Sequence, residues 1–92
     1  MANAEISGVP EIFGEVLRRH RTACGVTQEE LAFRAGVDRT FIYRLERGVR
    51  QPSITTLIGV ALALDIPASQ LVAETEARYR KASSTARRRT QS

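Results

Sequence analysis

Three glycines, Gly25, Gly36 and Gly48, divide the first half of this 92-residue chain into short segments. Each glycine follows a stretch in which apolar residues recur at the spacing of an amphipathic helix. Glycine often ends a helix because it adopts the left-handed backbone conformation without strain. The sequence therefore predicts short helices joined by tight turns, and it shows no alternation of the kind that marks β-strands.

Five helices are expected, because five start signals precede stretches with helical spacing. Proline suits the first turn of a helix, where its missing N–H is not needed. Side chains of Thr, Asp and Ser at a helix start accept hydrogen bonds from backbone N–H groups that have no partner within the helix. The expected fold class is therefore all-α. The start signals are Pro10, the capping-box pair Thr27 and Glu30, Asp38, Ser53 and Pro67.

Charge is distributed unevenly along the chain. Residues 1–76 hold eight arginines against ten Asp and Glu, whereas residues 77–92 hold five arginines and one lysine with no acid. The body has one basic island, 39–50, which contains four arginines and a single acidic residue, Glu46. A local basic island on a mildly acidic body indicates a site for a polyanion.

Composition also divides the chain into three parts. Residues 1–9 are expected to be a flexible segment, 10–76 the folded domain, and 77–92 a basic extension. Beyond Lys81 the residues are small, polar and basic, so this end is expected to be disordered. The extension could attract phosphate without sequence preference, or it could only keep the protein soluble, and both alternatives stay open.

Several classes of function are disfavoured. A single cysteine cannot form an intrachain disulfide, and one cysteine with one histidine makes a zinc cluster unexpected. The longest apolar run, 57–64, is too short to span a membrane, and no signal peptide is visible. No Gly-rich phosphate loop or nucleophile–base pair is present. The sequence therefore predicts a cytoplasmic protein that is not an enzyme and needs no cofactor or metal.

The segment 37–50, VDRTFIYRLERGVR, places its apolar and basic residues on opposite sides of a helix. Gly36 and Asp38 lie in a short connection to the preceding helix, as in a helix-turn-helix. Ile42 and Leu45 face one way, toward the body. The N-terminal half of such a helix enters the DNA major groove, where arginine bonds guanine. The residues expected to face outward are Arg39, Thr40, Tyr43, Arg44 and Arg47.

The stretch from TQEELAFRAGVDRTFIYRLERG to the following PSITTLIGVALALDI resembles the five-helix domain of the Xre/Cro repressor family. The DRTFI…ERG and PS elements are also similar to controller proteins of restriction–modification systems. The resemblance implies base reading by Arg39, Thr40 and Arg44, and phosphate contact by Arg47 and Arg50. It implies that Gln28 bonds a phosphate or braces the recognition helix. It places Phe41 and Tyr43 near the DNA backbone or a thymine methyl, and Glu46 at a structural position.

Residues with competing interpretations are His20, Cys24, Phe41 and Arg47. His20 lies on an apolar stripe without an evident catalytic partner, so a partly buried, hydrogen-bonded histidine is expected. Cys24 is expected to be a small apolar filler, with redox sensing as the alternative. Phe41 is expected to be partly exposed near DNA rather than fully in the core. Arg47 either contacts phosphate, pairs with a carboxylate or caps its helix.

The fourth expected helix is apolar nearly all round, so more than one of its sides must be buried. A chain of this size offers little to cover the second side, which favours a homodimer over a tolerated exposed leucine. The expected inward face is Ile54, Leu57, Val60, Ala61 and Leu64. The expected dimer interface is Leu62, Ile66, Leu71 and Val72.

These observations predict a sequence-specific transcriptional regulator, a repressor or autoregulator, that binds a palindromic operator in double-stranded DNA as a homodimer. The alternative is an antitoxin-like module that binds a partner protein and contacts DNA only secondarily. Co-purification with such a partner would favour the alternative.

Overall fold

The computed structural model describes residues 7–91, with side chains described for 7–84, and in this range it contains five helices and no strand. The expected five-helix, all-α fold is confirmed. Residues 1–6 of the expected flexible segment lie outside the described residues, and Val9 already belongs to the first helix. The helices are α1 (Val9–Ala23), α2 (Gln28–Ala35), α3 (Arg39–Arg47), α4 (Ile54–Ala63) and α5 (Ala68–Gln91).

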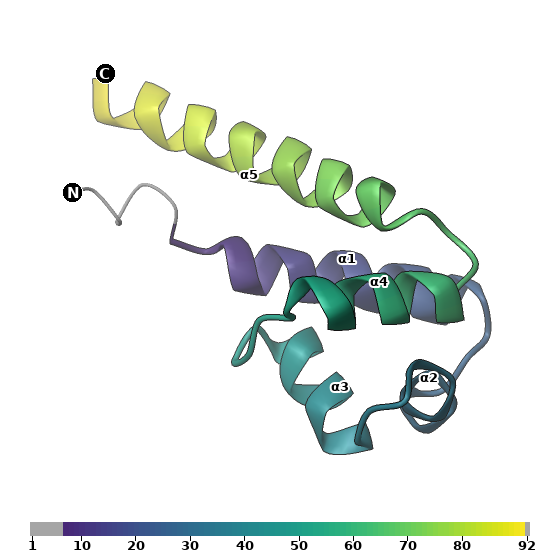
Figure 1. Cartoon of the computed structure of the whole chain (residues 1–92). Coiled ribbons are helices and arrows are strands. Elements are labelled where there is room, and N and C mark those ends of the chain that lie inside the picture. Colours follow the sequence, from purple (N-terminus) through teal and green to yellow (C-terminus); the bar gives the residue numbers. More distant parts are fainter. Residues whose placement is uncertain (1–6, 92) are drawn as a thin grey trace.

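The helices form layers in which α1 and α4 separate α5 from α3 (Figure 1). α1 packs against both α3 and α5, and α4 packs against both α2 and α5. α2 and α3 also contact each other, as the two helices of a helix-turn-helix do. α3 and α5 therefore lie at opposite edges of the molecule.

The helix ends follow the sequence signals closely. Thr27 and Glu30 form the expected capping box: the Thr27 Oγ1 accepts from the Glu30 N–H at 3.0 Å, and the Thr27 N–H donates to Glu30 Oε1 at 2.9 Å. These hydrogen bonds, chiefly that from the Thr27 backbone, lower the pKa of Glu30. Ser53 caps α4 through the Thr56 N–H at 3.1 Å. Asp38 occupies the N-cap position of α3, but its side chain makes no capping hydrogen bond.

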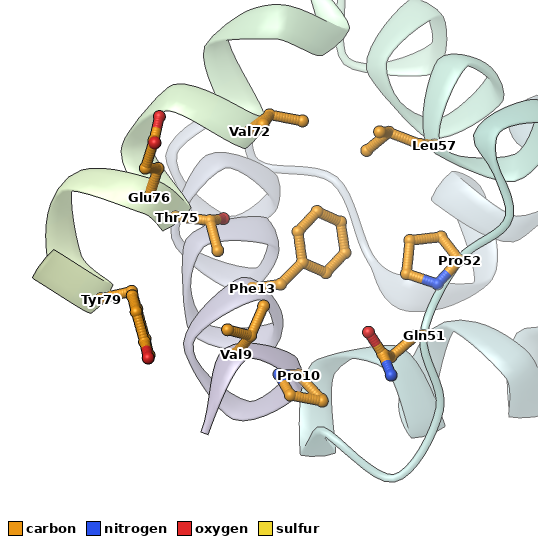
Figure 2. Close-up of a pocket in the computed structure, with 10 residues that line it drawn as sticks. All are labelled: Val9, Pro10, Phe13, Gln51, Pro52, Leu57, Val72, Thr75, Glu76 and Tyr79. Carbon is orange, nitrogen blue, oxygen red and sulfur yellow. The ribbon is translucent and has the colours of Figure 1, made fainter. Parts of the chain in front are cut away.

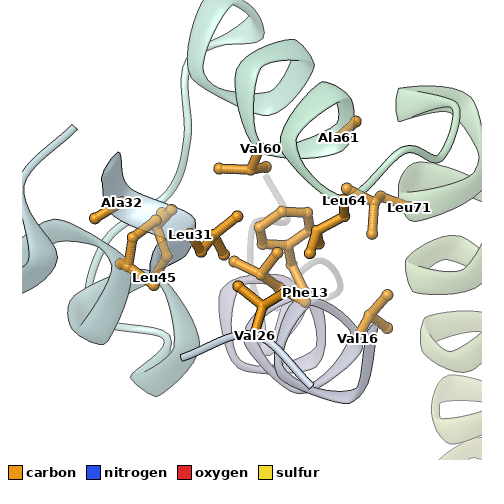
Figure 3. Packing of buried hydrophobic residues seen from close by; sticks show 12 residues of the cluster. Phe13, Val16, Val26, Leu31, Ala32, Leu45, Val60, Ala61, Leu64 and Leu71 are labelled. Atoms are coloured by element: carbon orange, nitrogen blue, oxygen red, sulfur yellow. The ribbon is translucent and has the colours of Figure 1, made fainter. Parts of the chain in front are cut away.

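One apolar core joins all five helices (Figure 3). Ile54 is absent from it and exposed, so its expected inward position is wrong. Ile54 shares a side of α4 with Ile58 and Leu62, which repeat at four-residue spacing away from the core. The core comprises Phe13, Val16, Leu17, Val26, Leu31, Ala32, Ile42, Leu45, Val60, Ala61, Leu64 and Leu71.

His20 and Cys24, near the end of α1, have different outcomes. His20 is half-buried, and its Nε2 lies 2.9 Å from Glu74 Oε1 of α5, which confirms the expected hydrogen-bonded histidine. Hydrogen bonds from Gln70 and His20 lower the pKa of Glu74. Cys24 is exposed, so its expected role as an apolar filler is wrong. It is the C-cap residue, where the chain leaves the packed face of α1.

The C-terminal extension differs from the expectation of disorder. α5 begins at Ala68, packs on the body through Leu71 and Thr75, and continues to Gln91. A helix that is already nucleated by packing adds residues at low cost, because each new residue brings a hydrogen bond. Ala, Arg, Lys and Gln favour this propagation, and no Gly or Pro follows Pro67 to end it.

Candidate nucleic-acid interface

α3 has one fully buried side and one exposed side. Ile42 and Leu45 have no exposed surface. Glu46, the only carboxylate within α3, is turned toward α1 and α2, so the outward side of the helix carries no acid from α3 itself. The sequence-based division of this helix is confirmed. The exposed residues, called the basic face below together with Arg50, are Arg39, Thr40, Tyr43, Arg44 and Arg47.

The C-terminal end of the basic face is folded back on α3. Gly48 ends the helix with φ 76°, and the backbone N–H groups of Val49 and Arg50 both donate to the Arg44 carbonyl, at 3.0 and 3.3 Å. Arg50 is therefore held beside the last turn of α3, where it adds a fourth arginine to the basic face.

Tyr43 and Arg47 contact each other along the outside of α3. The Arg47 Nη1 donates to the Tyr43 hydroxyl at 3.2 Å, and the guanidinium carbon lies 5.7 Å from the ring centre. Arg47 thus pairs with an aromatic ring rather than with a carboxylate. This pairing limits the rotamers of both side chains and keeps the Arg47 charge at the surface.

Phe41 is half-buried and packs against the core. This confirms the expected partial exposure of Phe41, while the buried part of its ring packs the first turn of α3 onto the core. A DNA contact from its exposed part stays a prediction.

A charged network fixes α3 to α1 and α2. Glu46 accepts from Arg21 Nε at 2.6 Å and Nη2 at 3.0 Å, and from Gln28 Nε2 at 3.0 Å. Arg21 also donates to the Val26 carbonyl at 2.9 Å. The exposed fractions of the Arg21 and Glu46 side chains are 12% and 4%. The expected structural role of Glu46 is confirmed, and Gln28 braces α3, which is one of the two roles expected for it.

A second constraint on α3 is the close approach of its backbone to α1. A Cβ atom placed on Gly14 would lie 2.5 Å from the carbonyl oxygens of both Leu45 and Glu46. Only glycine allows this contact. The sequence-based interpretation missed Gly14; its one signal was a glycine inside a helix where propensity disfavours it.

The dimer residues expected from the sequence have different environments. Leu62 is 74% exposed, Val72 is about half exposed and Ile66 is half-buried. Leu71 has no exposed surface because it packs in the core, so its assignment to an interface is wrong. The sequence-based interpretation missed Ile54 and Ile58, which extend the exposed side of Leu62 along α4. We call Ile54, Ile58 and Leu62 the α4 stripe.

An apolar groove of about 350 Å³ lies between the start of α1, the connection before α4, and α5 (Figure 2). Phe13 lies at its base, and Leu57 and Val72 approach from α4 and α5. At its edge, Glu76 pairs with Arg80 at 3.0 Å. Val72 therefore belongs to an apolar surface larger than its own side chain.

In the described part of the chain, no group of three or more His, Cys, Asp or Glu could hold a metal ion. In the same residues, no single helix has the length and apolar character to cross a membrane. α4 and the first part of α5 reach that length and apolar character only together, across a bend of 107°.

Comparison with known proteins identifies relatives that are helix-turn-helix proteins. Residues 17–71 match the profile of the Helix-turn-helix family. The HTH-type transcriptional regulator y4dJ of Sinorhizobium fredii is 36% identical over 66 residues, covering 72% of this chain and 86% of the relative.

Solved structures are similar in fold as well as sequence. The restriction–modification controller protein C.AhdI of Aeromonas hydrophila is 44% identical, with a TM-score of 0.65 over 66% of this chain and 92% of that chain. The controller protein C.Esp1396I, solved as a tetramer with its natural 35 base-pair operator, is 29% identical, with a TM-score of 0.65 over 75% and 96% of the two chains.

Proposed function

This chain belongs to the helix-turn-helix family, and we propose that it is a sequence-specific DNA-binding regulator of transcription, a repressor or autoregulator. The observation that carries the proposal is the basic face, which is presented outward by a helix fixed on its other side. The Arg21–Glu46–Gln28 network and the Gly14 contact set the position of α3 before DNA arrives. Such preorganisation lowers the cost of binding. No enzymatic activity is proposed, and a cytoplasmic location is proposed because the protein must reach genomic DNA.

We propose base reading by the first half of α3. Arg39 and Thr40 lie in its first turn and Arg44 one turn later, all exposed. This is the part of a recognition helix that enters the major groove. Arg47 and Arg50, at the other end, are assigned to phosphates, which set the register of the helix without reading sequence.

A palindromic operator requires two copies of α3 related by a two-fold axis. The α4 stripe, with Ile66 and Val72, is the proposed homodimer surface, because it gathers exposed apolar residues away from α3. The tetramer of C.Esp1396I on its operator supports oligomeric binding by this kind of domain.

The proposed function is tested by a salt titration of binding to the DNA upstream of the protein's own gene and to random duplex, with sedimentation in parallel. A preference for the upstream DNA of at least about a thousandfold, with a dimer bound, is expected. Equal, weak binding of both duplexes would contradict the proposal and would leave a protein-binding module as the remaining function.

Alanine at Arg39 and alanine at Arg50 should have different effects on binding. Arg39→Ala is expected to cost about 1–3 kcal/mol on the preferred duplex and to relax specificity at one position per half-site. Arg50→Ala is expected to weaken all duplexes alike and to lower the salt slope by about one unit. Competition binding with single-base variants measures both. Unchanged specificity for Arg39→Ala would contradict its base-reading role.

The proposed homodimer predicts that Leu62→Ser raises the dimer dissociation constant at least about tenfold, because each protomer loses apolar burial. Analytical ultracentrifugation without DNA measures this constant. Phe33→Ser, which changes a more exposed apolar residue outside the α4 stripe, is the matched control and should leave association unchanged. The reverse pattern would place the interface elsewhere.

A further inference from the structure

The basic extension at the end of α5 is the largest concentration of charge outside the basic face. Of the six cations in 77–92, Arg78 pairs with Glu15 of α1, and Arg80 pairs with Glu76 within α5. Three consecutive arginines follow at 87–89, and the whole stretch 77–92 contains no acid. The helical backbone continues through these positions to Gln91.

The extension is on the far side of the molecule from the basic face. α5 has 24 residues, so it is about 36 Å long. Figure 1 shows it running along the edge opposite α3 and continuing past the start of α1, with α1 and α4 in between. A duplex bound along α3 is therefore separated from the extension by the body of the protein.

The composition of the extension selects among polyanions. After Tyr79 no apolar side chain larger than alanine occurs, so the helix has no apolar side to insert into a membrane surface or an apolar groove of another protein. Five of the six cations in 77–92 are arginines. The planar guanidinium group of an arginine can donate two parallel hydrogen bonds to one phosphate. Phosphate is thus the favoured partner.

We propose that the extension of α5 binds the phosphates of a second DNA segment while α3 holds the operator, so that the protein bridges two duplexes. The proposal rests on the proposed function for its first contact. The extension contributes no sequence selection, because phosphate contacts read none. Bridging would raise the local concentration of one DNA segment near the other without any new contact at the operator.

A capture experiment tests the bridge. The preferred duplex is fixed to beads and loaded with protein, and a fluorescent random duplex is then offered in solution. The test variant is R87Q/R88Q/R89Q, and R87K/R88K/R89K is its matched control with the charge kept. Wild type and the lysine variant are expected to retain the second duplex. The glutamine variant is expected to retain at least about tenfold less, with a salt slope lower by about three units.

Binding to the fixed duplex is measured in the same experiment. The glutamine variant should bind it within about twofold of wild type, because the extension does not reach that duplex. Equal capture by the glutamine variant, no capture by wild type, or a parallel loss on the fixed duplex would each overturn the bridge. Fluorescent polyglutamate is offered to the same beads in a parallel assay. If it is retained more strongly than the random duplex, the partner of the extension is an acidic protein and not DNA. Failure of wild type to prefer any fixed duplex would instead remove the proposed function, and the bridge with it.

Discussion

Gly14→Ala is expected to destabilise the protein by about 3 kcal/mol, although alanine is the better helix former. The new methyl group would lie 2.5 Å from two backbone carbonyl oxygens of α3, those of Leu45 and Glu46. Backbone atoms cannot rotate away as a side chain end can. α1 and α3 must therefore separate, which opens the core around Leu17 and Ile42.

Gly59→Ala is the matched control, because Gly59 is also inside a helix. A Cβ atom there would lie 3.6 Å from the Ala35 carbonyl oxygen, an ordinary contact. This change should stabilise the protein by about 0.5–1 kcal/mol, the usual gain of alanine over glycine in a helix. Urea unfolding of the three proteins measures both effects. A stabilised Gly14→Ala would mean that α1 and α3 are not in backbone contact.

The Gly14 substitution should also affect DNA binding before it unfolds the chain. At a temperature where Gly14→Ala remains folded, its affinity for the preferred duplex should fall by at least about tenfold, because a displaced α3 misplaces several contacts at once. Gly59→Ala should bind as wild type does. If folded Gly14→Ala bound the preferred duplex as tightly as wild type, DNA binding would not depend on the backbone contact between Gly14 and α3.

The sequence predicted those features of the fold that depend on near neighbours. The capping box of Thr27 and Glu30 and the glycine at the end of α3 were found because each involves residues within one turn. The inward position of Ile42 and Leu45 followed from periodicity. These local signals agree with one another, which explains why the five helices could be placed without knowing their packing.

Features that depend on distant neighbours could not be read in the same way. The close approach at Gly14 joins positions about thirty residues apart, and the hydrogen bond of Gln28 to Glu46 spans 18. Ile54 was misplaced because a helix that is apolar nearly all round gives no periodicity to orient it. The helical extension was missed because its composition shows only that it has too few apolar residues to pack by itself. Composition does not show that a helix already packed on the body can continue into it.

Glu46→Gln is expected to destabilise the protein by about 3 kcal/mol. The glutamine keeps the shape of the side chain but removes its charge, and it leaves the Arg21 guanidinium, 12% exposed, without a carboxylate. The new amide also brings an N–H₂ group among the donors of Arg21 and Gln28. Thermal and urea unfolding measure the loss.

Two further variants distinguish a buried charge from a generally important ion pair. Arg80→Gln breaks the exposed Arg80–Glu76 pair, whose side chains are 75% and 58% exposed, and should change stability by less than about 0.5 kcal/mol. Arg21→Met with Glu46→Leu removes both buried charges and should be more stable than the sum of the single changes by at least about 1 kcal/mol. Additive single changes would mean that Arg21 and Glu46 do not stabilise each other.

The position of Glu46 explains why its loss should also weaken DNA binding. Its carboxylate joins α1, through Arg21, and α2, through Gln28, to the last turn of α3, while the exposed arginines begin at the other end. A change in the tilt of α3 about that last turn moves Arg39 farther than Arg47. Folded Glu46→Gln should therefore lose more affinity for the preferred duplex than for random duplex. An equal loss on both would show that the network supports only the fold and does not aim the recognition helix.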